Sequence, residues 1–183
     1  MFIASLKRKE NIAEYLLYMW QVEDIIRANG LNIDNLVANV INRYESLTEE
    51  QRKELTEWYE SLIDMMRREG VTESGHLQIN RNVVAQLSEI HKNLLRDPKF
   101  SEYSALYYRT LPYIVELRSR AGDKAEDEIT TCFTALYGML LLRLQKRELS
   151  SETASAMKEI SQFAATLAAY FHRNEEKPLF APD

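Results

Sequence analysis

The 183-residue sequence is poor in the residues that cross-link a chain or interrupt its helices, with one cysteine, five glycines and four prolines. The lone cysteine, Cys132, cannot form an intramolecular disulfide. Nothing therefore points to an oxidising compartment, and we expect a cytoplasmic protein. So few glycines also leave no phosphate-binding loop and no nucleophile elbow. Dinucleotide-binding and P-loop folds are therefore not expected.

Long apolar runs and an excess of positive charge are also missing. The longest apolar run, 132–142, ends at Arg143, well short of the about 20 residues that a membrane-spanning helix needs. The chain has 23 Lys and Arg against 28 Asp and Glu, a net charge of −5, whereas broad binding to nucleic acid requires clustered basic residues. We therefore expect a protein that binds neither membranes nor nucleic acid.

Helical periodicity is present over most of the chain. Apolar residues recur at spacings of three and four, and glycine or proline falls between most of the periodic segments. These segments predict helices at about Lys9–Asn29, Ile33–Ser46, Glu49–Glu69, Asn80–Arg96, Lys99–Arg120, Lys124–Arg147 and Ser151–Asn174. No segment predicts a strand, so the expected fold is an all-α compact bundle of about seven helices.

Several predicted helix ends carry a recognisable signal. Thr48 with Gln51 is typical of a capping box, and Asp123 with Glu126 is a looser version of the same pattern. Left-handed C-terminal positions are predicted at Gly30, Gly70 and Gly122. Pro112 lies inside a helical pattern, where it removes one hydrogen bond, so we expect the fifth helix to be bent there.

The chain shows no internal repeat and no low-complexity tract, and we expect one domain over residues 1–183. The weakest segment, 71–78, contains Thr72, Ser74 and Gly75 and is the place where a three-helix front could separate from a four-helix back. A front of about 70 residues would bury little by itself, which favours a single domain. Residues 177–183 are expected to form an extended tail because two prolines bracket Leu179 and Phe180.

The last predicted helix has the cleanest apolar line, formed by Met157, Ile160, Ala164, Leu167 and Phe171. Phe163 and Tyr170 lie on a second stripe of this helix, which is either a second internal face or a contact with another subunit. The small residues Ala135 and Gly138 on the sixth helix offer another possible dimer contact. We expect a homo-oligomer, most simply a dimer.

Residue patterns for metal or cofactor chemistry are missing. The sequence has three histidines, His76, His91 and His172, and none of them lies in a recognised metal-binding spacing. The one Glu-x-x-His pattern, Glu73 to His76, lies beside Gly75 in a segment without helical character. We therefore predict no metal, no cofactor and no catalytic residues, and we interpret Cys132 as small core packing.

Five polar residues lie at or beside positions that face the core: Glu23, Arg27, His91, Arg118 and Arg143. One hypothesis is that they line a polar cavity for a small anionic ligand. The other is structural. In it Glu23 pairs with Arg27 one turn away, His91 is a hydrogen-bonded core histidine, and the arginines complement the ends of their helices.

The opening segment ENIAEYLLYMWQVEDIIRANGLNID, Glu10 to Asp34, resembles the start of an all-helical bacterial protein family that is known only as a domain of unknown function. The resemblance covers most of the chain. It implies a bacterial helical protein and carries no activity and no site residues.

We expect a non-enzymatic helical interaction or structural protein that self-associates and that has, in addition, a possible protein partner. The alternative is a small-molecule binding protein or enzyme built around the five polar residues. An exposed apolar surface would favour the first class, and a concave polar cavity would favour the second.

Overall fold

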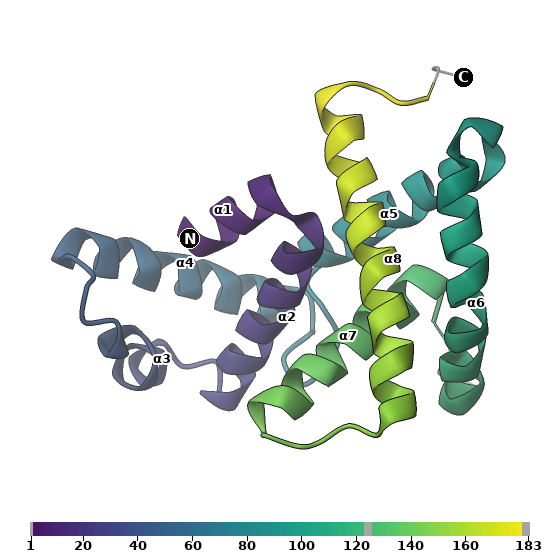
Figure 1. Ribbon diagram of the computed structural model, residues 1–183. Coiled ribbons are helices and arrows are strands. Elements are labelled where there is room, and N and C mark those ends of the chain that lie inside the picture. The colour runs from purple at the N-terminus through teal and green to yellow at the C-terminus, as the bar shows by residue number, and fades with distance from the viewer. Residues whose placement is uncertain (1, 123–125, 181–183) are drawn as a thin grey trace. The chain divides into compact units, whose positions relative to one another are not determined.

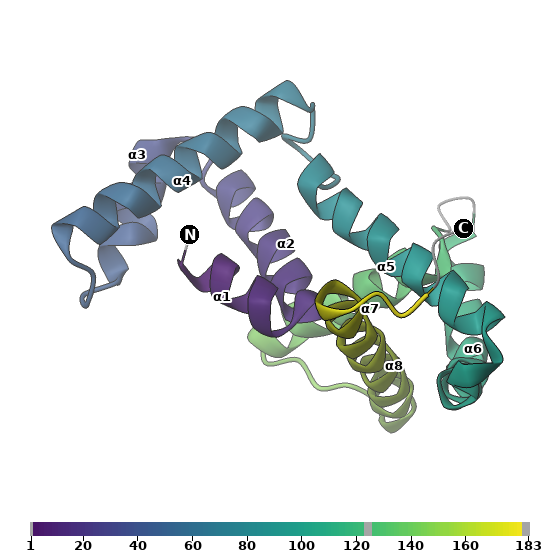
Figure 2. The ribbon, with the colours of Figure 1, turned by 90° about the horizontal axis from the view of Figure 1, so that it is seen from above.

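The computed structural model describes residues 2–122 and 126–180, and all the regular structure among them is helical (Figures 1 and 2). The all-α prediction is confirmed. The described residues form eight α-helices and two short 3₁₀ helices: α1 (Phe2–Glu10), α2 (Ile12–Ala28), α3 (Ile33–Asn39), η1 (Ile41–Arg43), α4 (Glu49–Arg68), α5 (Gln78–Arg96), η2 (Pro98–Phe100), α6 (Ser101–Ala121), α7 (Glu128–Leu144) and α8 (Ser151–Glu176).

The chain divides into two compact units. Unit 1 comprises Met1–Glu10 and Glu14–Asn82, and unit 2 comprises Asn11–Ala13 and Val83–Asp183. Helix α5 therefore contributes its first residues to unit 1 and the rest to unit 2. The single-domain expectation stays a prediction.

The core of unit 1 forms around α2 and α4. Leu16, Met19 and Trp20 of α2 are at most 2% exposed, and Met66 of α4 is fully buried. The N-terminus of α4 has the predicted capping box, because the Thr48 hydroxyl accepts from the Gln51 backbone and the Gln51 side chain accepts from the Thr48 backbone. This reciprocal pair satisfies two amide groups that the first turn leaves free. Helix α4 therefore begins where the sequence predicts.

Unit 2 is built on α6, α7 and α8, which pack on one another. The predicted apolar line of α8 is buried at every position. Phe163, on the second stripe of α8, is fully buried, so that stripe is an internal face. Tyr170 on the same stripe is half-buried, with its ring 5.6 Å from the ring of Tyr103. Cys132 is buried, as predicted from its line on α7.

Three predicted helix boundaries are wrong. Residues 2–10 form a helix of their own, α1, ahead of the predicted start at Lys9. The predicted helix Ile33–Ser46 is shorter, with α3 followed by the 3₁₀ turn η1. Helix α7 begins at Glu128 with Asp127 as its cap, because the Asp127 carboxylate accepts two backbone N–H groups there. The capping pair predicted at Asp123 lies outside the described residues.

Pro112 lies in the middle of α6, which continues through it as one helix. The expected bend stays a prediction. Gly30, Gly70 and Gly122 all have positive φ angles, as predicted for helix ends. At the end of the described chain Phe180 is half-buried, with its ring 5.7 Å from the ring of Phe100. The first part of the tail therefore lies against unit 2.

Candidate functional site

The five predicted site residues belong to different units. Glu23 and Arg27 lie on α2 in unit 1, whereas His91 on α5, Arg118 on α6 and Arg143 on α7 belong to unit 2. Within unit 2 the structure brings His91 and Arg118 to the same carboxylate, that of Glu128. Arg143 is exposed near the end of α7 and lines none of the described cavities.

Glu23 is a fully buried carboxylate with three hydrogen-bond donors. Its Oε2 lies 2.7 Å from Nδ1 of His76, and its Oε1 accepts from the Leu77 backbone N–H at 2.9 Å and from Asn80 Nδ2 at 2.6 Å. The predicted pairing of Glu23 with Arg27 is therefore wrong. A buried carboxylate needs several short hydrogen bonds, and the chain supplies them from a distant segment.

Arg27 has different partners. One guanidinium nitrogen pairs with Asp24 at 2.8 Å, and the other donates to the backbone carbonyls of Val71 and Gly75. The two carbonyls belong to the loop between α4 and α5. Arg27 therefore ties this loop to α2.

The ring of His76 closes the group around Glu23. It stacks on Trp20 with the ring centroids 4.0 Å apart and the planes at 11°. Glu23, His76 and Asn80 line none of the described cavities. We call Glu23 and its donors His76, Leu77 and Asn80 the Glu23 cluster. We interpret it as the group that holds the loop between α4 and α5 on α2, and not as a binding site.

The arrangement around His91 is different because it opens into a cavity. The cavity has a volume of about 690 Å³, and its polar side is lined by Ser88, Glu89, His91, Lys92, Arg118, Asp127 and Glu128. We call it the His91 cavity. His91 itself is only 5% exposed and lies on the buried side of α5, in step with Leu87 and Leu94. Two of the five predicted residues thus line one cavity.

The hydrogen bond of His91 fixes the orientation of its ring. Nδ1 lies 2.7 Å from the hydroxyl of Tyr103, and Nε2 points toward Glu128 at 3.8 Å. If Nδ1 carried the proton, the Nε2 lone pair would face a carboxylate, which is unfavourable. We therefore assign the proton to Nε2 and the accepting lone pair to Nδ1, with the Tyr103 hydroxyl as donor.

Glu128 lies between three groups. The Tyr107 hydroxyl donates to Oε2 at 2.7 Å, whereas the two basic side chains are more distant, His91 at 3.8 Å and Arg118 at 4.0 Å. The last two distances exceed a hydrogen bond. Nε of Arg118 is also buried and has no hydrogen-bond partner among the described residues. N–H donors of His91 and Arg118 are therefore left without a close acceptor on the wall of the His91 cavity.

Burial sets the protonation states around the cavity. It lowers the pKa of His91, and the nearby carboxylate of Glu128 opposes that shift without overcoming it. Burial also raises the pKa of Cys132 to about 12. At neutral pH His91 is therefore a neutral donor, and Cys132 is a protonated thiol without nucleophilic character.

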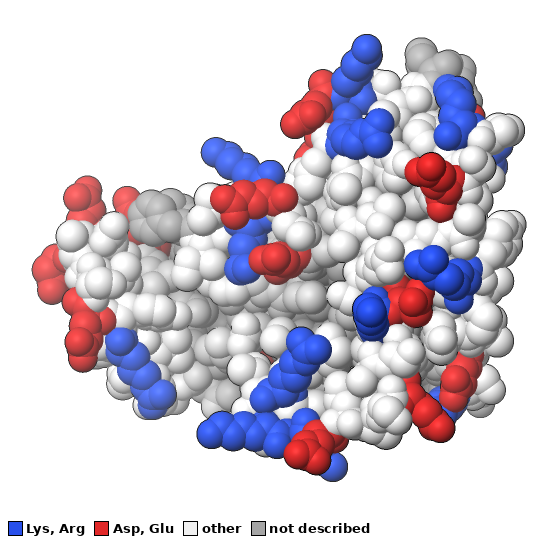
Figure 3. All heavy atoms as spheres, viewed as in Figure 1, with Lys and Arg blue, Asp and Glu red and all other residues white. Residues whose placement is uncertain are grey.

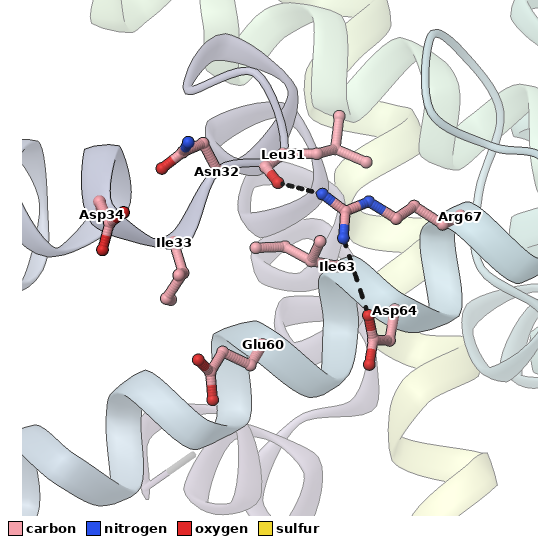
Figure 4. A pocket seen from close by; sticks show the side chains of 8 residues that line it. All are labelled: Leu31, Asn32, Ile33, Asp34, Glu60, Ile63, Asp64 and Arg67. Atoms are coloured by element: carbon pink, nitrogen blue, oxygen red, sulfur yellow. Dashed lines mark hydrogen bonds and ion pairs between the residues drawn. The ribbon is translucent and has the colours of Figure 1, made fainter.

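A second, more acidic cavity of about 330 Å³ lies in unit 1 where α3 begins beside α4 (Figure 4). Figure 4 shows Arg67 between the carbonyl of Leu31 and the carboxylate of Asp64, while Asp34 and Glu60 lie farther along the cavity. The arginine is thus already engaged by the chain's own groups. The cavity is acidic, and its one basic residue, Arg67, holds the turn before α3.

Within the described residues no group of three or more His, Cys, Asp and Glu side chains is arranged to hold a metal ion. Among the described helices, none is both long and apolar enough to cross a membrane.

Sequence reasoning missed two residues of the Glu23 cluster, His76 and Asn80, and two residues near His91, Tyr107 and Glu128. His76 and Asn80 lie 53 and 57 residues from Glu23, so no local spacing connects them. Tyr107 and Glu128 had a weaker signal, because Tyr107 lies on the core line of its helix and Glu128 follows a capping aspartate. The two residues lie 21 positions apart, so no local spacing pairs them.

Comparison with known proteins gives a family and no function. Residues 1–177 match the model of a family described as a domain of unknown function (DUF4924). The chain therefore belongs to that family, in agreement with the resemblance of its opening segment. Neither a curated protein nor a solved structure matches the chain.

Proposed function

We propose that this protein is a non-enzymatic interaction protein that self-associates through one face of α6. The observation that carries the proposal is a strip without charge along that helix. The strip spans about 120° of the helix surface and consists of Ser101, Ser104, Ala105, Tyr108, Leu111, Pro112, Val115 and Ser119. We call it the α6 strip.

The apolar side chains of the α6 strip are unusually open. Tyr108 is 64% exposed and Val115 is 54% exposed, although both are large hydrophobic residues. Leu111 and Pro112 lie between them, half-buried and exposed respectively. A solvent-facing helix surface is normally dominated by charged residues, so an exposed strip without charge favours a protein contact.

The size of the strip predicts a weak contact. A helix of 21 residues is about 30 Å long, and a face about 10 Å wide covers about 300 Å². Stable interfaces use about 800 Å² on each partner. The flanking residues must therefore contribute, and we expect a dimer that dissociates in the micromolar range.

The charges beside the α6 strip fit a second copy of the same chain. Arg109 and Glu116 lie seven residues apart on one flank, and their side chains are 56% and 58% exposed. A two-fold axis perpendicular to the helix places this flank against the same flank of the other copy, running in the opposite direction. Arg109 of each copy then faces Glu116 of the other, with the centre of the contact close to Pro112.

The present partners of these two residues do not prevent that pairing. Arg109 donates to Glu159 at 2.7 Å, and Glu116 pairs with Arg120 one turn away. Exposed ion pairs of this kind contribute little to stability, about 0 to 1 kcal/mol. A network shared with a second copy can therefore include them.

The surface charge supports a protein partner over nucleic acid. On the face drawn in Figure 3, Lys and Arg are interspersed with Asp and Glu, and neither sign forms a continuous surface there. Together with the net charge of −5, this favours a protein partner over nucleic acid, and we place the protein in the bacterial cytoplasm as part of the proposal.

Sedimentation equilibrium over a micromolar concentration series tests the proposal. Val115→Glu places a charge in the α6 strip and is expected to shift the protein to monomer. Leu144→Glu is the matched control, because Leu144 is 58% exposed and lies on α7. It is expected to leave the association unchanged. Equal behaviour of the two variants would refute the α6 strip as the contact.

Cysteine cross-linking tests the direction of the contact. The native Cys132 is buried, so the background is low. Pro112→Cys is expected to form a disulfide between copies, because position 112 lies at the centre. Ser119→Cys is not expected to do so, since the two copies of position 119 lie about 21 Å apart along the helix axis. Cross-linking through Ser119→Cys alone would exclude the antiparallel arrangement.

A further inference from the structure

We infer that the His91 cavity binds a small zwitterion, a free α-amino acid, through Glu128 for the ammonium group and Arg118 for the carboxylate. The inference is independent of self-association, because it depends on the polar wall of the cavity and not on the α6 strip.

The first support is that both signs of charge line the same cavity. Glu128 and Asp127 lie at the start of α7, Arg118 lies on α6, and Lys92 and Glu89 lie on α5. A ligand that is only an anion would meet the carboxylates at close range. A ligand that is only a cation would meet Arg118, which lies 4.0 Å from Glu128. A molecule with one group of each sign satisfies both sides.

The second support is the pair of N–H donors on the wall that have no close acceptor. His91 is more than nine-tenths buried, yet its Nε2 reaches no acceptor closer than the Glu128 oxygen at 3.8 Å. Nε of Arg118 is buried without a partner among the described residues. A carboxylate that accepts from both nitrogens would satisfy two donors that the chain itself leaves open.

The third support is an apolar side of the same cavity. Ile129 is 2% exposed, and Leu95 and Ala85 line the cavity beside it. This wall suits an aliphatic side chain next to the charged groups. The cavity volume of about 690 Å³ lies in the range of small-molecule sites, about 300 to 1,000 Å³.

The test begins with the unmodified protein and each proteinogenic amino acid, followed by NMR of the histidine rings. The chain has three histidines, so His76 and His172 serve as internal references for His91. We expect an aliphatic amino acid to shift the His91 ring signals in a saturable way and to leave the His76 signals in place. No shift with any amino acid, or equal shifts of all three rings, would overturn the inference.

Analogues of the binding amino acid separate a zwitterion site from a simple ion site. The decarboxylated amine and the deaminated acid each keep only one charged group. Each is expected to bind at least about tenfold more weakly than the parent, because one charged contact is lost. Binding of the acid alone with the same affinity would replace the zwitterion by an anion, which is the ligand class predicted from the sequence, and would overturn the inference.

Two variants assign the contacts. Arg118→Gln and Glu128→Gln are each expected to weaken binding at least about tenfold. Arg96→Gln and Glu148→Gln are the matched controls, since both residues are exposed and line none of the described cavities. Far-UV circular dichroism confirms that each variant is folded. Unchanged affinity in the folded Arg118→Gln and Glu128→Gln variants would overturn the inference.

Discussion

Replacement of Glu23 tests how far the Glu23 cluster stabilises unit 1. The carboxylate is fully buried and accepts from His76, Leu77 and Asn80. Glu23→Ala leaves the buried N–H groups of Leu77 and Asn80 and the half-buried ring of His76 without an acceptor, and each lost hydrogen bond to a charged group costs about 1.5 to 3 kcal/mol. Partial relaxation and water entry reduce that sum. We expect a loss of about 3 to 5 kcal/mol in the free energy of unfolding, below the plain sum of the three hydrogen bonds.

Urea denaturation followed by tryptophan fluorescence measures this effect. Trp20 and Trp58 both belong to unit 1, so the signal reports the unit that carries the substitution. Glu57→Ala is the control, because Glu57 is 62% exposed and its pair with Lys53 is long, at 3.9 Å. That control is expected to cost no more than about 0.5 kcal/mol.

The comparison of single donors refines the result. His76→Ala and Asn80→Ala each leave the Glu23 carboxylate with two donors, so each is expected to cost less than Glu23→Ala. The effects of neighbouring members are expected to be non-additive, because they share one acceptor. If Glu23→Ala cost no more than the Glu57→Ala control, the carboxylate would not hold the loop, and our interpretation of the cluster would be wrong.

Three further predictions concern groups outside this cluster. Burial lowers the pKa of His91 below its ordinary 6.5, so the unfolded chain binds this proton more readily than the folded chain. The free energy of unfolding should therefore fall as the pH drops below about 6.5. His91→Gln should reduce this pH dependence in thermal melts. Because burial raises the pKa of Cys132 to about 12, a thiol reagent at pH 8 should label it only after denaturant is added. Thr48→Ala removes the cap of α4 and should cost about 1 kcal/mol in urea titrations, with Ser61→Ala as the surface control.

The fold could be predicted from the sequence because helices are local. A capping box such as Thr48 with Gln51 is complete within four residues, and the apolar line of α8 needs only the helical period. The boundary errors have an equally local cause. Residues 2–10 span only nine positions and end in three consecutive basic residues and Glu10, so the short helix α1 gave no clear period.

The hydrogen-bond partners of the buried polar residues could not be predicted, because tertiary packing determines which distant groups meet. Arg27 was the nearest basic residue to Glu23 in the helical period, yet its guanidinium is used by the carbonyls of Val71 and Gly75. Glu23 instead binds donors that reach it through the loop before α5. A local rule finds the neighbour along the helix, whereas a buried carboxylate takes the donors that satisfy it most completely.

The α6 strip shows a different limit of sequence reasoning. Periodicity identifies apolar faces but does not tell whether each one faces the core or a partner, so the two apolar faces of α6 could not be told apart from the sequence. In α6 the buried side carries Tyr103, Tyr107 and Ile114, while Tyr108 and Val115 on the other side are open. Exposure, which periodicity does not report, distinguishes the two sides, and the charges of Arg109 and Glu116 beside the open side support our proposal that α6 meets a second copy there.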